Sequence, residues 1–177
     1  MGWTPPSDVQ VATTSRRRVN RPPIPSRLNA RPPSEPVGRE LKLADAGALC
    51  RAALARAEAE QALVSVAVVD AGGNLVAFGR MDGAEIAGPT LATDKAFTAV
   101  ALRVDTARLA VLAAPGGELA GLASNGGGRY VIFGGGVPIW VEGRIAGGIG
   151  VSGGSVEQDM ACAEAASRVW DERCSSE

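Results

Sequence analysis

The sequence contains no histidine, and this absence excludes several kinds of site. A catalytic triad built on histidine is ruled out, and a zinc site loses one of its usual ligands. The three cysteines, Cys50, Cys162 and Cys174, form an odd set without a Cys-x-x-Cys pair. They argue against a disulfide framework and a metal site, so the sequence predicts reduced thiols, a cytoplasmic chain and no bound metal.

Long apolar runs are absent as well. No stretch of about 18 consecutive apolar residues occurs, so the sequence predicts no membrane span. The first residues include arginines but lack the apolar segment of a secretory signal, and we therefore expect no such signal. Aromatic residues make up 4% of the chain, and the three tryptophans are too scattered to form a stacking platform for bases. We do not expect nucleic acid as a partner.

Residues 1–39 differ in composition from the remainder. Eight of the 11 prolines lie there without apolar periodicity, which predicts an extended or disordered arm. Seven arginines oppose two acidic residues in this arm, a net charge of +5, whereas residues 40–177 carry −6. The arm could lie on its own domain or on a neighbouring subunit, contact phosphates, or remain solvated. The predicted organisation is an arm, 1–39, and a single domain, 40–177.

Hydrophobic periodicity predicts four helices and five strands in the domain. The helices are expected over 43–61, 89–103 and 106–113, with a last one that begins at the capping box Ser155–Gln158. The strands are expected over 64–69, 75–81, 130–133, 137–141 and 145–151.

The segment 133–154 carries the clearest of these signals. Two β-branched runs flank the short turn 142–144, which is typical of a hairpin, and we expect this hairpin at the centre of the sheet. Pro138 cannot donate a hydrogen bond to a neighbouring strand, so its strand should lie at an edge. The connections predict an α/β protein of the α+β type, with a five-stranded, mainly antiparallel sheet packed by helices.

Several segments together resemble the GlcG/HbpS family, which includes the C-terminal domain of PduO-type proteins. They read VAVVDAGGNLVAFGRMDGA, ATDKAFTA and GGGVPIWVEGRIAGGIGVSGG, followed by Gln158-Asp159. The match spans about Leu43 to Trp170, and the arm lies outside it. The resemblance implies a profilin-like fold and a homo-oligomer. Because some members bind haem, it also implies haem as a candidate ligand.

Lys95 is the candidate residue with the most specific chemistry. On a helix rich in alanine, it could hold a ligand carboxylate, or act as a base or Schiff-base amine if desolvated. It could instead form a salt bridge with Asp70, with Asp82 or near Asp94, or extend into solvent.

Further candidates lie at the hairpin ends and on the same helix as Lys95. Arg80 could bind an anion or pair with Asp82. Thr90 and Thr98 could donate to a ligand, although threonine more often bonds back to its own helix. Three glycines before the second hairpin could offer backbone amides to a carboxylate, or serve a tight turn. The predicted ligand-binding set is Arg80, Asp82, Thr90, Lys95, Thr98, Gly134, Gly135 and Gly136.

Three functions stay open. The first is a homo-oligomer that binds a small molecule, either haem or an anionic metabolite. Without histidine, Met81, Thr98 or a cysteine would have to supply the axial ligand of haem. The second is a cofactor-independent isomerase or lyase acting on a small carboxylate or carbonyl compound, with Lys95 as its catalytic residue. The missing histidine weakens this function equally. The third is an assembly or accessory protein without a small ligand.

Overall fold

The computed structural model describes residues 39–175, so most of the predicted arm lies outside the described residues. The elements are α1 (Leu43–Ala59), β1 (Ser65–Asp70), β2 (Leu75–Arg80), α2 (Gly88–Leu102), α3 (Thr106–Leu112), β3 (Gly136–Val141), β4 (Arg144–Ser152) and α4 (Val156–Ser175). Two 3-10 turns, Leu122–Ser124 and Gly126–Gly128, lie between α3 and β3. None of the described helices is both long and apolar enough to cross a membrane.

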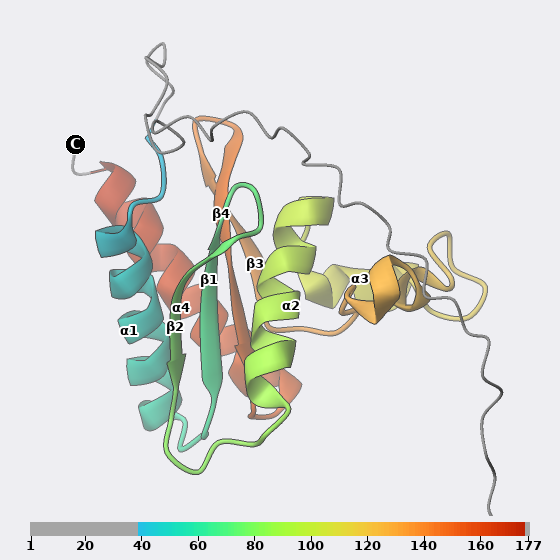
Figure 1. The fold of residues 1–177 in the computed structure, drawn as a ribbon, viewed down its shortest axis with the longest axis horizontal. Coiled ribbons are helices and arrows are strands. Elements are labelled where there is room, and N and C mark those ends of the chain that lie inside the picture. The colour runs from blue at the N-terminus through green and yellow to red at the C-terminus, as the bar shows by residue number, and fades with distance from the viewer. Residues whose placement is uncertain (1–38, 176–177) are drawn as a thin grey trace, which may run out of the picture. The chain divides into compact units, whose positions relative to one another are not determined.

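The sheet has four antiparallel strands in the order β2-β1-β4-β3 (Figure 1). The hairpin β3-β4 therefore contributes one central strand, β4, and one edge strand, β3. Pro138 lies in β3, in agreement with the prediction that its strand is at an edge. The missing N–H of proline is tolerated there because only one side of the strand is paired.

The prediction of a fifth strand over 130–133 is wrong. In the part of the chain that the structure describes, this segment does not join the sheet. The backbone N–H of Val131 instead donates to Oγ1 of Thr98 over 3.0 Å. A side chain of α2 thus accepts the hydrogen bond that a neighbouring strand would accept in a sheet. The residue types at 130–133 suit both arrangements and do not distinguish them.

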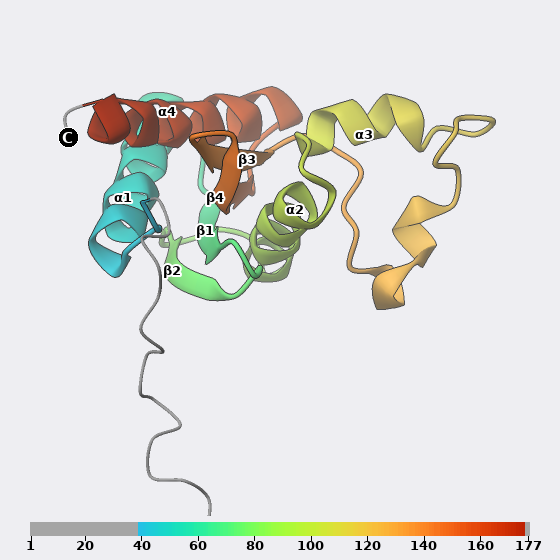
Figure 2. The ribbon, with the colours of Figure 1, turned by 90° about the horizontal axis from the view of Figure 1, so that it is seen from above.

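Helices cover both faces of the sheet (Figures 1 and 2). On one face α2 packs against β1, β4 and β3, and on the other α1 and α4 lie side by side. Alternation along the strands supplies an apolar surface to each face. The cluster under α2 contains Ala67, Val69, Ala92, Ala96 and Val100. The larger cluster under α1 and α4 includes Val66, Val68, Ile149, Val151 and the fully buried Trp170.

The close approach of α2 to β4 depends on glycine. A side chain at Gly150 would overlap the carbonyl oxygen of Ala92. A Cβ atom at Gly148 would lie 2.8 Å from the carbonyl oxygen of Ala96, closer than real Cβ atoms come. Alanine on the helix and glycine on the strand therefore let the two backbones pack closely, and this packing draws the middle of α2, including Lys95, into the interior.

The start of α4 follows the predicted capping box. The N–H of Ser155 donates to Oε1 of Gln158 over 2.9 Å, and the N–H of Gln158 donates to Oγ of Ser155 over 3.2 Å. Each side chain satisfies a backbone donor that the first turn of a helix leaves unpaired. This cap fixes where α4 begins and thereby positions Asp159 in its first turn.

Candidate functional site

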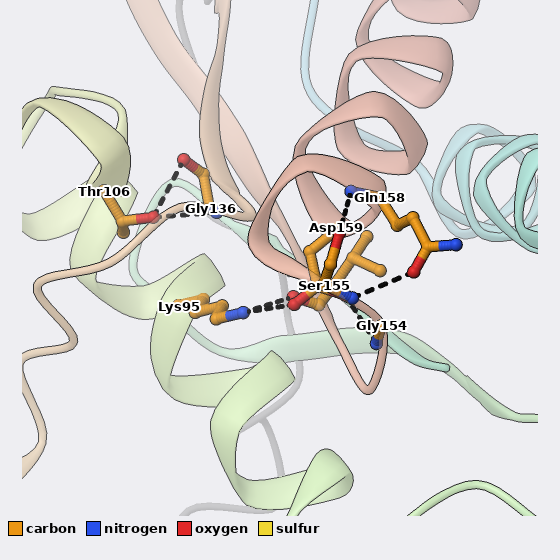
Figure 3. A network of polar contacts seen from close by, with 8 residues as sticks. Lys95, Thr106, Gly136, Gly154, Ser155, Gln158 and Asp159 are labelled. Carbon is orange, nitrogen blue, oxygen red and sulfur yellow. Dashed lines mark hydrogen bonds and ion pairs between the residues drawn. The ribbon is translucent and has the colours of Figure 1, made fainter. Parts of the chain in front are cut away.

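The ammonium group of Lys95 lies at the centre of a buried polar cluster (Figure 3). Its Nζ donates to Oδ2 of Asp159 over 2.7 Å and to the carbonyl of Val151 over 2.8 Å. The ring of Phe133 covers it, with the ring centroid 4.7 Å from Nζ. The other carboxylate oxygen of Asp159 accepts the N–H of Gly154 at 3.0 Å. The cluster therefore joins α2, the end of β4 and the start of α4.

Burial and pairing oppose each other in this cluster. Burial lowers the pKa of Lys95 and raises the pKa of Asp159, because both charged forms lose water, while the hydrogen-bonded ion pair opposes each shift. Asp159, and not Asp70, Asp82 or a residue near Asp94, is the partner of Lys95. The two residues are 64 positions apart, so no local spacing relates them. The motif Gln158-Asp159 within the family resemblance is the one signal that could have found it.

Gly135 and Gly136, at the start of β3, lie against this cluster, and a larger residue would not fit at either position. A Cβ atom at Gly135, which has φ +109°, would lie 2.6 Å from the carbonyl oxygen of Val151 and 2.9 Å from Nζ of Lys95. The N–H of Gly136 donates to Oγ1 of Thr106 over 2.9 Å. That amide already has a partner within the protein, an arrangement that favours a packing role for the glycines.

The structure also brings Thr98 toward this loop, but it leaves Arg80, Asp82 and Thr90 apart from Lys95 and the glycines. Thr98 is fully buried, whereas Thr90 is exposed. Arg80 and Asp82 are exposed at the end of β2. Arg80 in β2 lies opposite Ser65 of β1, and Ser65 lies opposite Ser152 of β4, so Arg80 is two strands away from the end of β4. It donates to the carbonyl of Ala84.

An open hollow of about 310 Å³ adjoins the glycine loop. It is lined by Asp105, Ala107, Gly135, Gly136, Val137, Met160, Glu164, Ser167 and Arg168. Three of these residues, Met160, Glu164 and Arg168, recur at four-residue steps and so share one face of α4. Glu164 and Arg168 form an ion pair at 3.5 Å. Burial and the carboxylate of Glu164 raise the pKa of Asp105.

Nothing in the local sequence marks this hollow. A methionine followed by charged residues on the outer face of a helix is the usual pattern of a solvated surface. Only the packing of β3 and the N-terminal end of α3 beside α4 makes that face concave, and neither contact is visible in the local sequence.

The fold and its polar cluster define a small α+β domain whose antiparallel sheet has helices on both faces. Residues 41–168 match the family described as "Haem degrading protein HbpS-like", and the chain belongs to this family. The resemblance found in the sequence is thereby confirmed.

The relatives include both larger and similar-sized proteins. The corrinoid adenosyltransferase PduO of Citrobacter freundii is 48% identical over 118 residues, which cover 67% of this chain and 35% of PduO. The chain thus spans about a third of the length of that relative. An uncharacterised 15.0 kDa protein from the dhaT-dhaS intergenic region of the same organism is 40% identical over 126 residues, 71% of this chain and 89% of that protein.

Solved structures show the same fold. The Klebsiella pneumoniae protein ORFY superimposes with a TM-score of 0.74 at 33% identity, covering 80% of this chain and 97% of ORFY. A complex of PduOC with haem gives a TM-score of 0.72 at 43% identity, covering 74% and 95% of the two chains. A double mutant of Streptomyces reticuli HbpS gives 0.70 at 34% identity, covering 79% and 93%.

Proposed function

We propose that this domain binds haem within a homo-oligomer. The observation that carries the proposal is the solved complex of haem with PduOC, which is 43% identical to this chain over 74% of its length. The family description, a haem-degrading protein, supports the same class of ligand.

Most of the candidate axial ligands in this chain are enclosed. Burial raises the pKa of the Cys162 thiol to about 11, and Cys50 is likewise buried with a raised pKa, so both stay protonated within the core. Oγ1 of Thr98 accepts a hydrogen bond from Val131 inside the protein. Met81 packs against the apolar core.

The hollow beside β3 fits the ligand better, because it offers a thioether, a guanidinium and apolar walls. Haem would supply a redox-active iron when bound. The chain's own residues would orient the ligand and exclude water from it. Ala107 and Val137 would cover part of one face, and Arg168 would pair with a carboxylate. In the single chain the hollow is open on one side, so a second subunit would be needed to enclose a ligand of this size.

Exposed apolar side chains support the oligomer. Ile86 is 94% exposed and Val111 is 76% exposed, and Trp140 on the edge strand is 40% exposed. Burying these side chains against a second subunit would remove apolar surface from water, which favours association. A homo-oligomer would cover them and would also narrow the hollow.

The alternative, an isomerase or lyase with Lys95 as catalytic residue, requires the amine to reach a substrate. Nζ of Lys95 donates to Asp159 and Val151 and lies beneath Phe133. This arrangement favours a structural role for the amine, and we therefore place the binding function first.

Titration of the purified full chain with haemin tests the proposed function. We expect a saturable absorbance change at micromolar haemin, with one haem bound per subunit or per pair of subunits. The same titration in concentrated urea serves as a control for unspecific adsorption. An absorbance change that never saturates, or that is equal in urea, would refute haem binding. Sedimentation of a monomer at micromolar concentration would refute the oligomer.

A further inference from the structure

Met160 supplies the one thioether among the residues that line the hollow beside β3. Met160 is partly buried, and its Sδ lies so close to the glycine loop that a Cβ atom at Gly134 would approach it to 2.7 Å. A thioether is a neutral axial ligand that haem iron accepts in other proteins. Met81, the other methionine in the described residues, packs against the core.

Apolar surface continues from Met160 on more than one side. Val156 lies one turn earlier on the same face of α4 and is 42% exposed, and Phe133, in the loop beside it, is 39% exposed. Val137 of β3 and Ala107 of α3 line the hollow itself. Apolar side chains grouped around one donor atom suit a broad, flat ligand better than a small polar metabolite.

Three charged residues also line the hollow: Asp105, Glu164 and Arg168. Arg168 follows Met160 by eight residues, roughly 12 Å along α4. Its partner Glu164 is 54% exposed and Arg168 itself 71% exposed, and exposed ion pairs of this kind contribute little stability. A carboxylate of a ligand can therefore replace Glu164 as the partner of the guanidinium, which accepts two oxygens at once.

On these grounds, and resting on the proposed function, we propose that Met160 supplies the axial donor to haem iron and that Arg168 binds a haem propionate. The apolar part of the ligand would then contact Val156 and Met160, and Arg168 would hold its anionic edge. Because a thioether ligand raises the reduction potential of haem, the chain should bind ferrous haem more tightly than ferric haem.

The test compares variants of the full chain in titrations with haemin and with dithionite-reduced haem. Met160→Leu keeps the volume and removes the donor, so it should weaken binding of reduced haem by roughly tenfold or more and change the absorption spectrum. Met81→Leu and Cys174→Ser are the matched controls for the other sulfur atoms, and both should bind as the wild type does. Met160→His should give the spectrum of an imidazole-ligated haem.

Two charge variants test the other end of the hollow. Arg168→Gln should weaken binding, whereas Glu164→Gln should strengthen it, because it removes the competing partner of the guanidinium. Unchanged thermal melting of each apoprotein would show that the fold is retained.

The outcomes separate this inference from the proposed function. If the wild type binds haem saturably while Met160→Leu keeps both affinity and spectrum, Met160 is not the donor and the proposed function stands. Loss of the spectrum in Cys174→Ser would assign the donor to that thiol and overturn the inference. If the wild type binds neither form of haem, both proposals fail.

Discussion

The ammonium nitrogen of Lys95 lies 2.7 Å from a carboxylate oxygen of Asp159, and their side chains are only 0% and 4% exposed. The two residues come from helices on opposite faces of the sheet, α2 and α4, and they meet at the end of β4. The carbonyl of Val151 in β4 accepts a second hydrogen bond from the same nitrogen. The ion pair thereby links the two helical layers to the central strand.

Replacing Lys95 with methionine should destabilise the protein strongly. The variant keeps most of the apolar stem but leaves Asp159 as an unpaired buried charge, which typically costs about 3–5 kcal/mol. Urea unfolding measures the loss. The chain's only other lysine, Lys42, is exposed, so Lys42→Met serves as the control and should change the free energy of unfolding by less than about 0.5 kcal/mol. If Lys95→Met instead unfolds like the wild type and loses ligand binding, the lysine is a ligand-binding residue.

The destabilisation of Lys95→Met should depend on pH. Burial raises the pKa of Asp159, and the variant loses the lysine that opposes this shift, so the pKa rises further. When folding raises the pKa of an acid, the protein loses stability at pH values above the pKa that the acid has in the unfolded chain. This loss becomes smaller as pH falls through the pKa that the acid has in the folded protein. The deficit against the wild type should therefore be largest near neutral pH and shrink in acid. In the double variant Lys95→Met/Asp159→Asn, the side chain at position 159 cannot titrate. If the stability of this double variant, relative to the wild type, depended on pH in the same way, this explanation would be contradicted.

Local features of the fold could be predicted from the sequence, and features that join distant segments could not. The hairpin, the edge position of Pro138 and the cap at Ser155 follow from turn and capping chemistry within a few residues. The supposed strand at 130–133 has strand-like residues, but its acceptor is a threonine of α2. The partner of Lys95 and the hollow at Met160 both depend on which helix faces meet, and that is decided by packing across the whole domain.

Alanine substitutions at Gly135 and Gly116 can separate the cost of backbone strain from the cost of crowding by neighbouring atoms. Both have positive φ, +109° and +84°, but the space around Gly116 is open, whereas a Cβ atom at Gly135 would press on Val151. We expect Gly116→Ala to cost about 1–2 kcal/mol from backbone conformation alone. Gly135→Ala should cost about 2–5 kcal/mol, since crowding adds to the same strain. Equal melting temperatures for the two variants would show that the glycine loop yields to a side chain.

Thr98→Val should destabilise the protein without a specific effect on ligand binding. The change leaves the buried N–H of Val131 without its acceptor, which typically costs about 1–3 kcal/mol. Thr98→Ser keeps the hydroxyl and is expected to lose less. Urea unfolding and haemin titration of both variants separate the two roles of the residue. A fall in haem affinity at unchanged stability would assign Thr98 to the ligand, as the sequence analysis allows.

The predicted arm can be tested by two truncations that differ by one residue. Arg39 lies within the described domain, where it donates to the carbonyl of Arg173 over 2.8 Å and to Asp45 over 3.3 Å, and stacks on Trp170 with its guanidinium 5.3 Å from the ring. A chain that begins at Arg39 should melt close to the full chain if residues 1–38 are a solvated arm. A chain that begins at Glu40 should lose about 1–3 kcal/mol, because the nearly buried Asp45 then has one charged partner fewer. A large loss already in the longer truncation, or a smaller oligomer in sedimentation, would show that the arm contributes to the folded assembly.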